Sequence, residues 1–150
     1  MSADLDSLSA RVAACLQDAT SLVYPTDAIA EGLRQALAEI STSLVGAHSA
    51  APLTLAGLDG ASVTSLPEGL TSLAVQGAAA MVVSGRGLRH AEQMALAPEG
   101  LTPASLTWAE AVWNRFCRSC ERLRSSALRG STVPWAEMGW ILDGHDGEVF

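Results

Sequence analysis

The longest helical pattern in the chain covers residues 66–97, and Pro98 follows directly after it. Apolar residues recur along it mostly every three or four positions, which is the spacing of one helix face. Small residues occupy the middle of that face, at positions 77–80, and leave room for another helix to approach closely. The pattern therefore predicts a long helix around which others pack, and two glycines, Gly85 and Gly87, could kink it or break it.

Three further stretches show helical spacing of apolar residues. The first covers residues 4–19, and the second begins at the N-cap Thr26. The last begins at Pro103, directly after the N-cap Thr102, and ends near Arg129 and Gly130. Within the second stretch, Gly32 marks close packing, because a glycine in a helix interior costs about 1 kcal/mol relative to alanine.

Residues 46–65 lack helical spacing and are richer in glycine, serine and proline. Leu53 and Leu55 alternate with polar or small residues, and Asp59-Gly60 is a strong signal for a two-residue turn. The pattern predicts a short β-hairpin between the second and third helices. Because an isolated hairpin is only marginally stable, we expect it to lie against the helices or against another subunit.

The predicted fold is mainly α: a four-helix bundle with the short β-hairpin and an extended C-terminal arm. The bundle forms one domain, residues 1–130, and the arm covers residues 131–150. The arm lacks helical spacing and contains Pro134 and three glycines, yet it holds several large apolar side chains. Soluble proteins seldom expose such a group, and tryptophan is enriched at binding hot spots. We predict that the partner-binding residues are Trp135, Met138, Trp140, Ile141, Leu142 and Phe150. From the residues alone, docking of the arm on a partner and folding of the arm back onto the bundle are equally favoured.

The charge of the chain narrows the class of partner. The chain carries 16 acidic residues and nine basic ones, all arginine, for a formal net charge of −7. Such a chain is a poor non-specific DNA binder, because affinity for phosphates needs clustered cations. No apolar run is long enough for a membrane span, and the acidic N-terminus is unlike a secretory signal, so we expect a soluble, unexported protein.

Candidate chemistry is sparse. Cys117 and Cys120 form a C-x-x-C pair, but the three histidines are scattered and the pair lies deep inside a predicted helix. A zinc site needs further ligands, and a redox pair needs a βαβ setting. Gly85-Arg-Gly87 lacks the phosphate-loop pattern, and Asp143 to Asp146 lacks the calcium-loop spacing. We therefore expect no catalytic residue, no metal site and no cofactor, and reduced cysteines.

The order of these elements resembles that of the head–tail adaptor (connector) proteins of long-tailed bacteriophages and prophages. The stretch YPTDAI…LRQAL, from Tyr24, is similar to their second helix, and SLPEGLTSLAVQGAAAMV, from Ser65, is similar to the start of their third. Leu58-Asp59-Gly60-Ala61 falls between them, and a helix bearing Trp and Phe follows. The resemblance covers roughly residues 5–128.

The resemblance implies a virion structural protein without enzymatic activity. Such proteins form a ring, usually of twelve copies, beneath the portal protein, and connect it to a tail-side stopper or tail-terminator protein. DNA passes through the ring without specific binding, and no membrane is involved. The protein would be made in the host cytoplasm and work in the neck of the virion, with its arm on the portal or on a neighbouring copy. The alternatives are a bacterial helical-bundle interaction module or small regulator, and a small enzyme or ligand carrier with a pocket between helices.

Overall fold

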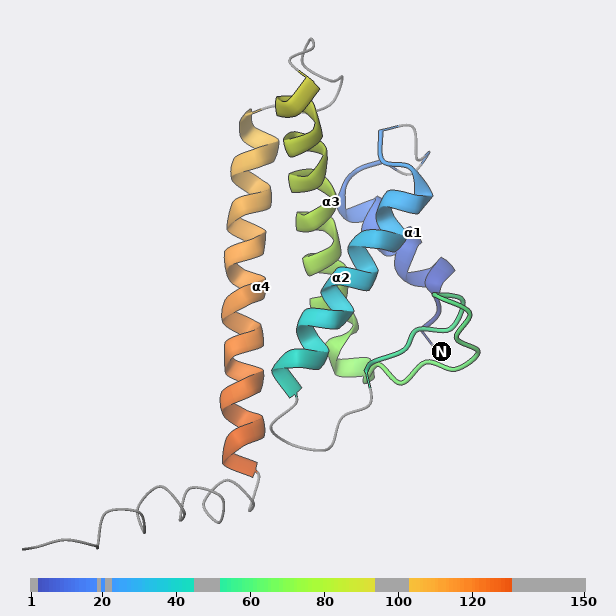
Figure 1. The fold of residues 1–150 in the computed structure, drawn as a ribbon, viewed down its shortest axis with the longest axis vertical. Helices are drawn as coiled ribbons and strands as arrows, with labels where there is room; N and C mark the ends of the chain where they lie inside the picture. The colour runs from blue at the N-terminus through green and yellow to red at the C-terminus, as the bar shows by residue number, and fades with distance from the viewer. Residues whose placement is uncertain (1–2, 19, 21–22, 45–51, 94–102, 131–150) are drawn as a thin grey trace, which may run out of the picture.

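The structure, a computed structural model, describes residues 3–18, 20, 23–44, 52–93 and 103–130. These residues are mainly helical, which confirms the predicted mainly α character of the fold. The α-helices among them are α1 (Leu5–Cys15), α2 (Thr26–Leu44), α3 (Thr71–Gln93) and α4 (Pro103–Gly130) (Figure 1). A short 3-10 helix, η1 (Glu68–Leu70), directly precedes α3.

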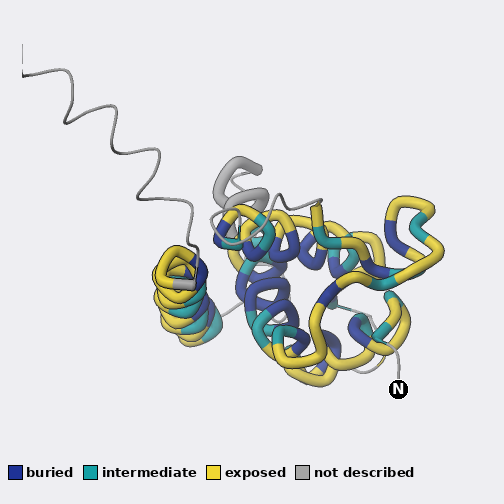
Figure 2. The backbone as a smooth tube through the Cα atoms, turned by 90° about the horizontal axis from the view of Figure 1, so that it is seen from below, coloured by how far each residue is buried: buried dark blue, intermediate teal, exposed yellow. Residues whose placement is uncertain are grey.

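Helix α3 is the centre of the bundle, as its pattern predicts. It contacts α1, α2 and α4. Figure 1 shows α4 running beside it on one side and α1 lying on the other. Its small residues Ala78, Ala79 and Ala80 have no exposed surface. Figure 2 shows the same arrangement from below, with exposed positions on the side of α4 that faces away from the bundle.

Two glycines mark the closest approaches between helices. A Cβ atom on Gly77 of α3 would lie 2.6 to 2.9 Å from the ring of Phe116 in α4. A Cβ atom on Gly32 of α2 would lie 2.7 Å from Val82 Cγ2 and 2.9 Å from the carbonyl oxygen of Ala78. Both distances are too short for real contacts, so only glycine permits these two crossings. The close packing predicted at Gly32 is confirmed.

The two glycines near the end of α3 do not break it, because α3 continues through Gly85 and Gly87 to Gln93. The helix is held here by Arg86, whose guanidinium donates a hydrogen bond to the carbonyl oxygen of Val23. Such tertiary contacts offset the low helix propensity of glycine, which costs about 1 kcal/mol per residue relative to alanine.

The remaining helix ends lie within a few residues of those predicted. Helix α3 begins at Thr71, after η1, and not at residue 66, and Thr26 is the first residue of α2 rather than its N-cap. Asp4 is the N-cap of α1, which begins at Leu5. In a capping box, the Asp4 carboxylate accepts a hydrogen bond from the Ser7 N–H. Helix α1 ends at Cys15, earlier than the predicted residue 19, since Gln17 has a φ of 56°. Helix α4 runs from Pro103 to Gly130 as predicted, whereas its expected N-cap lies outside the described residues.

The predicted β-hairpin is wrong. Residues 52–67 form an irregular loop, and no strand occurs in the described part of the chain. The Ser65 N–H does donate to the Thr54 carbonyl oxygen at 3.0 Å, but hydroxyl groups take the neighbouring hydrogen bonds. Thr54 N–H donates to Ser65 Oγ at 2.9 Å, and Ala56 N–H donates to Thr64 Oγ1 at 3.0 Å. Side-chain oxygens thus replace the carbonyl partners that a strand ladder requires.

This loop nevertheless lies against the helices, as predicted. Leu55 and Leu58 are buried in the core. The chain turns tightly around Leu58, and φ is positive at Gly57, Asp59 and Gly60. Ala56 forms an isolated parallel bridge with the N-cap residue of α1. A spacing of three residues between the buried leucines suits a turn rather than a strand, in which every second residue faces one side.

Candidate functional site

The six predicted partner-binding residues of the arm lie outside the described residues, so that site stays a prediction. So does the division of the chain into residues 1–130 and 131–150. The structure instead describes three features of the bundle that bear on function: a cleft between α2 and α3, the cysteine pair of α4, and the outer face of α4.

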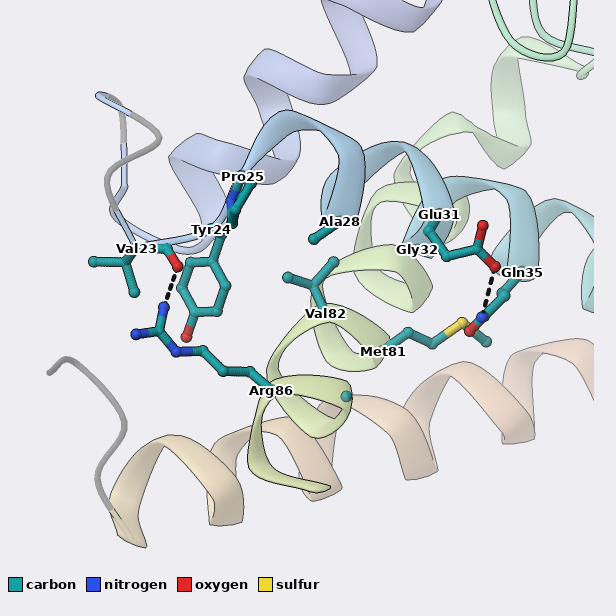
Figure 3. Close-up of a pocket in the computed structure, with 11 residues that line it drawn as sticks. Val23, Tyr24, Pro25, Ala28, Glu31, Gly32, Gln35, Met81, Val82 and Arg86 are labelled. Atoms are coloured by element: carbon teal, nitrogen blue, oxygen red, sulfur yellow. Dashed lines mark hydrogen bonds between the residues drawn. The ribbon is translucent and has the colours of Figure 1, made fainter. Parts of the chain in front are cut away.

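The cleft lies where the N-terminal half of α2 crosses the second half of α3 and has a volume of about 330 Å³. Figure 3 shows Val82 of α3 pointing toward Ala28 of α2, and Met81 of α3 extending toward Gln35 of α2. The same close approach that requires Gly32 therefore shapes the cleft.

A small polar cluster closes one end of the cleft. The Arg86 guanidinium lies over the Tyr24 ring at 5.3 Å from its centroid and donates to the Val23 carbonyl oxygen. The buried carboxylate of Asp18 accepts hydrogen bonds from the N–H groups of Val23 and Tyr24, at 3.0 and 2.7 Å. Burial raises the pKa of the Tyr24 phenol. The positive charge of Arg86 acts against this shift, and the negative charge of Asp18 adds to it. This cluster holds the connection from α1 to α2 against α3.

At the other end of the cleft, Gln35 Nε2 donates to Glu31 Oε1 at 2.9 Å. The other Glu31 oxygen pairs with Arg34, which also forms two hydrogen bonds to the Asp59 carboxylate from Nε and one from Nη2. Arg34 lowers the pKa of Asp59. The main polar side chains around the cleft are thus bonded to other groups of the protein.

The cysteine pair lies inside α4, as the sequence indicates. Cys117 is half-buried and Cys120 is buried, and both are free thiols. Burial raises the pKa of both thiols, and the nearby Glu39 carboxylate raises them further. A reactive cysteine needs the opposite shift. Among the described residues, no group of three histidine, cysteine or acidic side chains is placed to hold a metal ion.

The outer face of α4 carries a row of arginines that the helix pattern did not single out. Arg115, Arg118, Arg122 and Arg129 follow one another at spacings of three, four and seven residues, which places them on one face of the helix. All four are exposed, and the row extends about 21 Å along the axis at 1.5 Å per residue. This arginine row could have been found from the sequence by testing charged residues for helical spacing.

Two adjoining hollows accompany the arginine row on the C-terminal half of α4. One, of about 490 Å³, lies between the start of α3 and α4 and is lined by the half-buried Leu70, Leu73 and Leu123. The other, a shallow and open depression of about 490 Å³, is lined by side chains of α4 alone, three of which are arginines of the row. They share Arg122 and Ser126, so an apolar groove continues directly into a basic depression. We call the two together the α4 surface.

Large exposed apolar side chains occur in the loop of residues 52–67 and near both ends of α4. Val63 in the loop is 69% exposed, Leu106 and Trp108 near the start of α4 are 42% and 37% exposed, and Leu128 near its end is 47% exposed. None of the helices in the described residues combines the length and apolar character that a bilayer span requires.

Comparisons add no family: no family model matches the chain, and neither the curated proteins nor the solved structures give a match.

Proposed function

We propose that this protein is a virion structural protein of the head–tail adaptor type. It would assemble as a ring, usually of twelve copies, beneath the portal protein and connect it to the tail-side stopper or terminator protein, with packaged DNA passing through the ring. It would have no catalytic role. The proposal rests on the resemblance of residues 5–128 to this family and on one observation, the exposed apolar side chains on two unlike elements, the loop of residues 52–67 and the start of α4.

The two surfaces are the loop of residues 52–67 with Val63, and the start of α4 with Leu106 and Trp108. Figure 1 shows the loop and α4 on opposite sides of α3. When two different patches of one chain bind each other, the contact is head-to-tail, and such contacts close into rings where the rotation allows it. This arrangement supports a ring better than a two-fold dimer, which would use one patch twice.

The loop is suited to such a contact because it is fixed to the bundle on two sides. Arg34 of α2 binds the Asp59 carboxylate, and Ala56 bridges to Asp4. Within the loop, the Thr54 hydroxyl also donates a hydrogen bond to Ser65 Oγ at 3.2 Å. A preorganised loop loses little conformational freedom on binding, so it can use a small apolar contact efficiently.

The charge distribution also suits a ring around DNA. Helix α4 carries five arginines and two glutamates, a formal charge of +3, whereas the rest of the chain carries four arginines and fourteen acidic residues, or −10. Opposite charge on different elements favours contacts between copies. The excess of acid over the whole chain would let DNA pass without tight binding.

Substitution of Val63 tests this contact. The wild-type chain, the Val63→Asp variant and a control, Ser62→Asp, would each be mixed with the portal protein encoded in the same genome, and the particle mass measured. Ser62 is exposed in the same loop, so the control adds the same charge one residue away. We expect rings with wild type and Ser62→Asp and none with Val63→Asp, although all three fold. Rings with Val63→Asp would reject this contact, and no assembly of the wild type would reject the adaptor role.

A further inference from the structure

The α4 surface has an uncommon combination of chemistry: apolar side chains at one end and cations at the other. Leu70, Leu73 and Leu123 line the groove, and Arg118, Arg122 and Arg129 line the adjoining depression. Glu121 also lines the depression, so its formal charge is +2. A ligand for this surface must present bulky apolar groups followed by anionic ones within a short distance.

The arginines of the α4 surface are available for such a ligand. Both ion pairs recorded among the described residues belong to Arg34 of α2. Arg118 Nε donates to the Asn114 carbonyl oxygen of its own helix at 3.3 Å, and Arg118, Arg122 and Arg129 are all exposed residues. Charge-assisted hydrogen bonds from arginine to carboxylates are among the stronger polar contacts in proteins, so unused arginines on a helix face favour an anionic partner.

One segment of this chain has the required chemistry in the required order. Trp140, Ile141 and Leu142 are followed by Asp143, Asp146 and Glu148, and no lysine or arginine occurs between residues 131 and 150. Three adjacent apolar residues match the leucine-lined groove, and three carboxylates match the three arginines of the depression. Nucleic acid, the other common partner of an arginine row, would have to approach a chain with a net charge of −7 and has no apolar group for the groove.

The connection between α4 and this segment is long enough. From Gly130 to Trp140 the chain has ten residues, which extend to at most about 36 Å. Arg122 lies eight residues before Gly130, or about 12 Å back along the helix axis. A connection long enough to span the two sites gives a local concentration in the millimolar range, so that even weak contacts within one molecule are populated.

We propose that, in the free chain, residues 140–148 dock on the α4 surface of their own molecule. Trp140, Ile141 and Leu142 enter the groove, and the three carboxylates bind Arg118, Arg122 and Arg129. The contact covers apolar residues that a soluble chain would otherwise expose. A partner that binds the arm must first displace this contact. The proposal concerns the free chain and holds or fails independently of the adaptor role.

Hydrogen exchange measured by mass spectrometry on the full chain tests the proposal. In the wild type, we expect amides of residues 140–148 to exchange about tenfold or more slowly than in an unstructured peptide, because docked backbone opens less often. The double variant Arg118→Glu/Arg122→Glu should lose this protection. Arg124→Glu should keep it, because Arg124 is exposed on a different face of the same helix. Raised salt should lower the protection in the wild type.

A second variant leaves the bundle untouched and covers the case in which the arginine variant fails to fold. Asp143→Asn/Asp146→Asn/Glu148→Gln should remove the protection as well. Four results would overturn the proposal: no protection in the wild type, protection unchanged in both charge variants, protection that disappears on dilution, or an unprotected wild-type arm together with duplex DNA binding that depends on Arg118 and Arg122. The third result would assign the docked arm to a neighbouring copy, and the fourth would assign the arginine row to nucleic acid.

Discussion

Gly77 allows α3 and α4 to approach each other, and replacing it with alanine tests that contact. The new Cβ atom would lie 2.6 Å from Phe116 Cε2, so the ring has to move. The ring is 1% exposed and stacks on Trp113 with 5.3 Å between centroids, which restricts its movement. Overpacking of this kind costs about 1–3 kcal/mol, whereas alanine in place of glycine in a helix gains about 1 kcal/mol. We expect Gly77→Ala to lower the free energy of unfolding by about 1 kcal/mol.

The matched control is Gly85→Ala in the same helix, where a Cβ atom would meet nothing within 4 Å. That variant should gain about 0.5–1 kcal/mol from the more restricted backbone. Urea unfolding followed by circular dichroism at the helix band gives both values. The two variants should therefore shift the unfolding midpoint in opposite directions. If Gly77→Ala proved as stabilising as Gly85→Ala, α4 would not lie this close to α3, and the bundle described above would be wrong.

Three further predictions follow from single contacts. Asp18→Ala should lower the free energy of unfolding by about 1–3 kcal/mol, measured by urea unfolding, because it leaves two backbone N–H groups near the start of α2 without their acceptor. In maleimide labelling near neutral pH, exposed Cys15 should react first and Cys120 last, because burial covers Cys120 and raises the pKa of its thiol. Arg34 lowers the pKa of Asp59 in the folded chain, so the pair stabilises the fold above the unfolded pKa of about 3.9. This stability is lost as the pH falls through the lower folded pKa, and hydrogen exchange of residues 52–67 should show the loss as reduced protection. The Asp59→Asn variant should not show this acid-dependent loss.

The sequence predicted the helices well because their signals are local. Helical spacing, Pro103 and the acidic residues at the start of the first helix were enough to place the ends within a few residues, and Gly32 indicated a close crossing. The prediction of a β-hairpin in residues 52–67 was wrong because the alternation of apolar residues and the Asp59-Gly60 turn are also compatible with an irregular loop. Which partners the backbone finds there is decided by the hydroxyl groups of Thr54, Thr64 and Ser65, and by the pairing of Asp59 with Arg34.

The candidate surfaces could be predicted only in part. The arginine row follows from spacing alone, but the leucine groove beside it combines residues of η1, α3 and α4 that come together only in the folded chain. The cleft between α2 and α3 likewise depends on how Gly32 and Val82 meet. The arm residues are predicted from composition alone, and they lie outside the described residues.

The most direct test of the adaptor role is the mass of the complex that the full chain forms with the portal protein encoded in the same genome. Native mass spectrometry of the portal ring, with and without added chain, gives the number of copies bound. The account predicts a closed ring with many copies on each portal, usually twelve in this family, and weak self-association of the chain alone. An unchanged portal mass, or a single copy bound per portal ring, would contradict it.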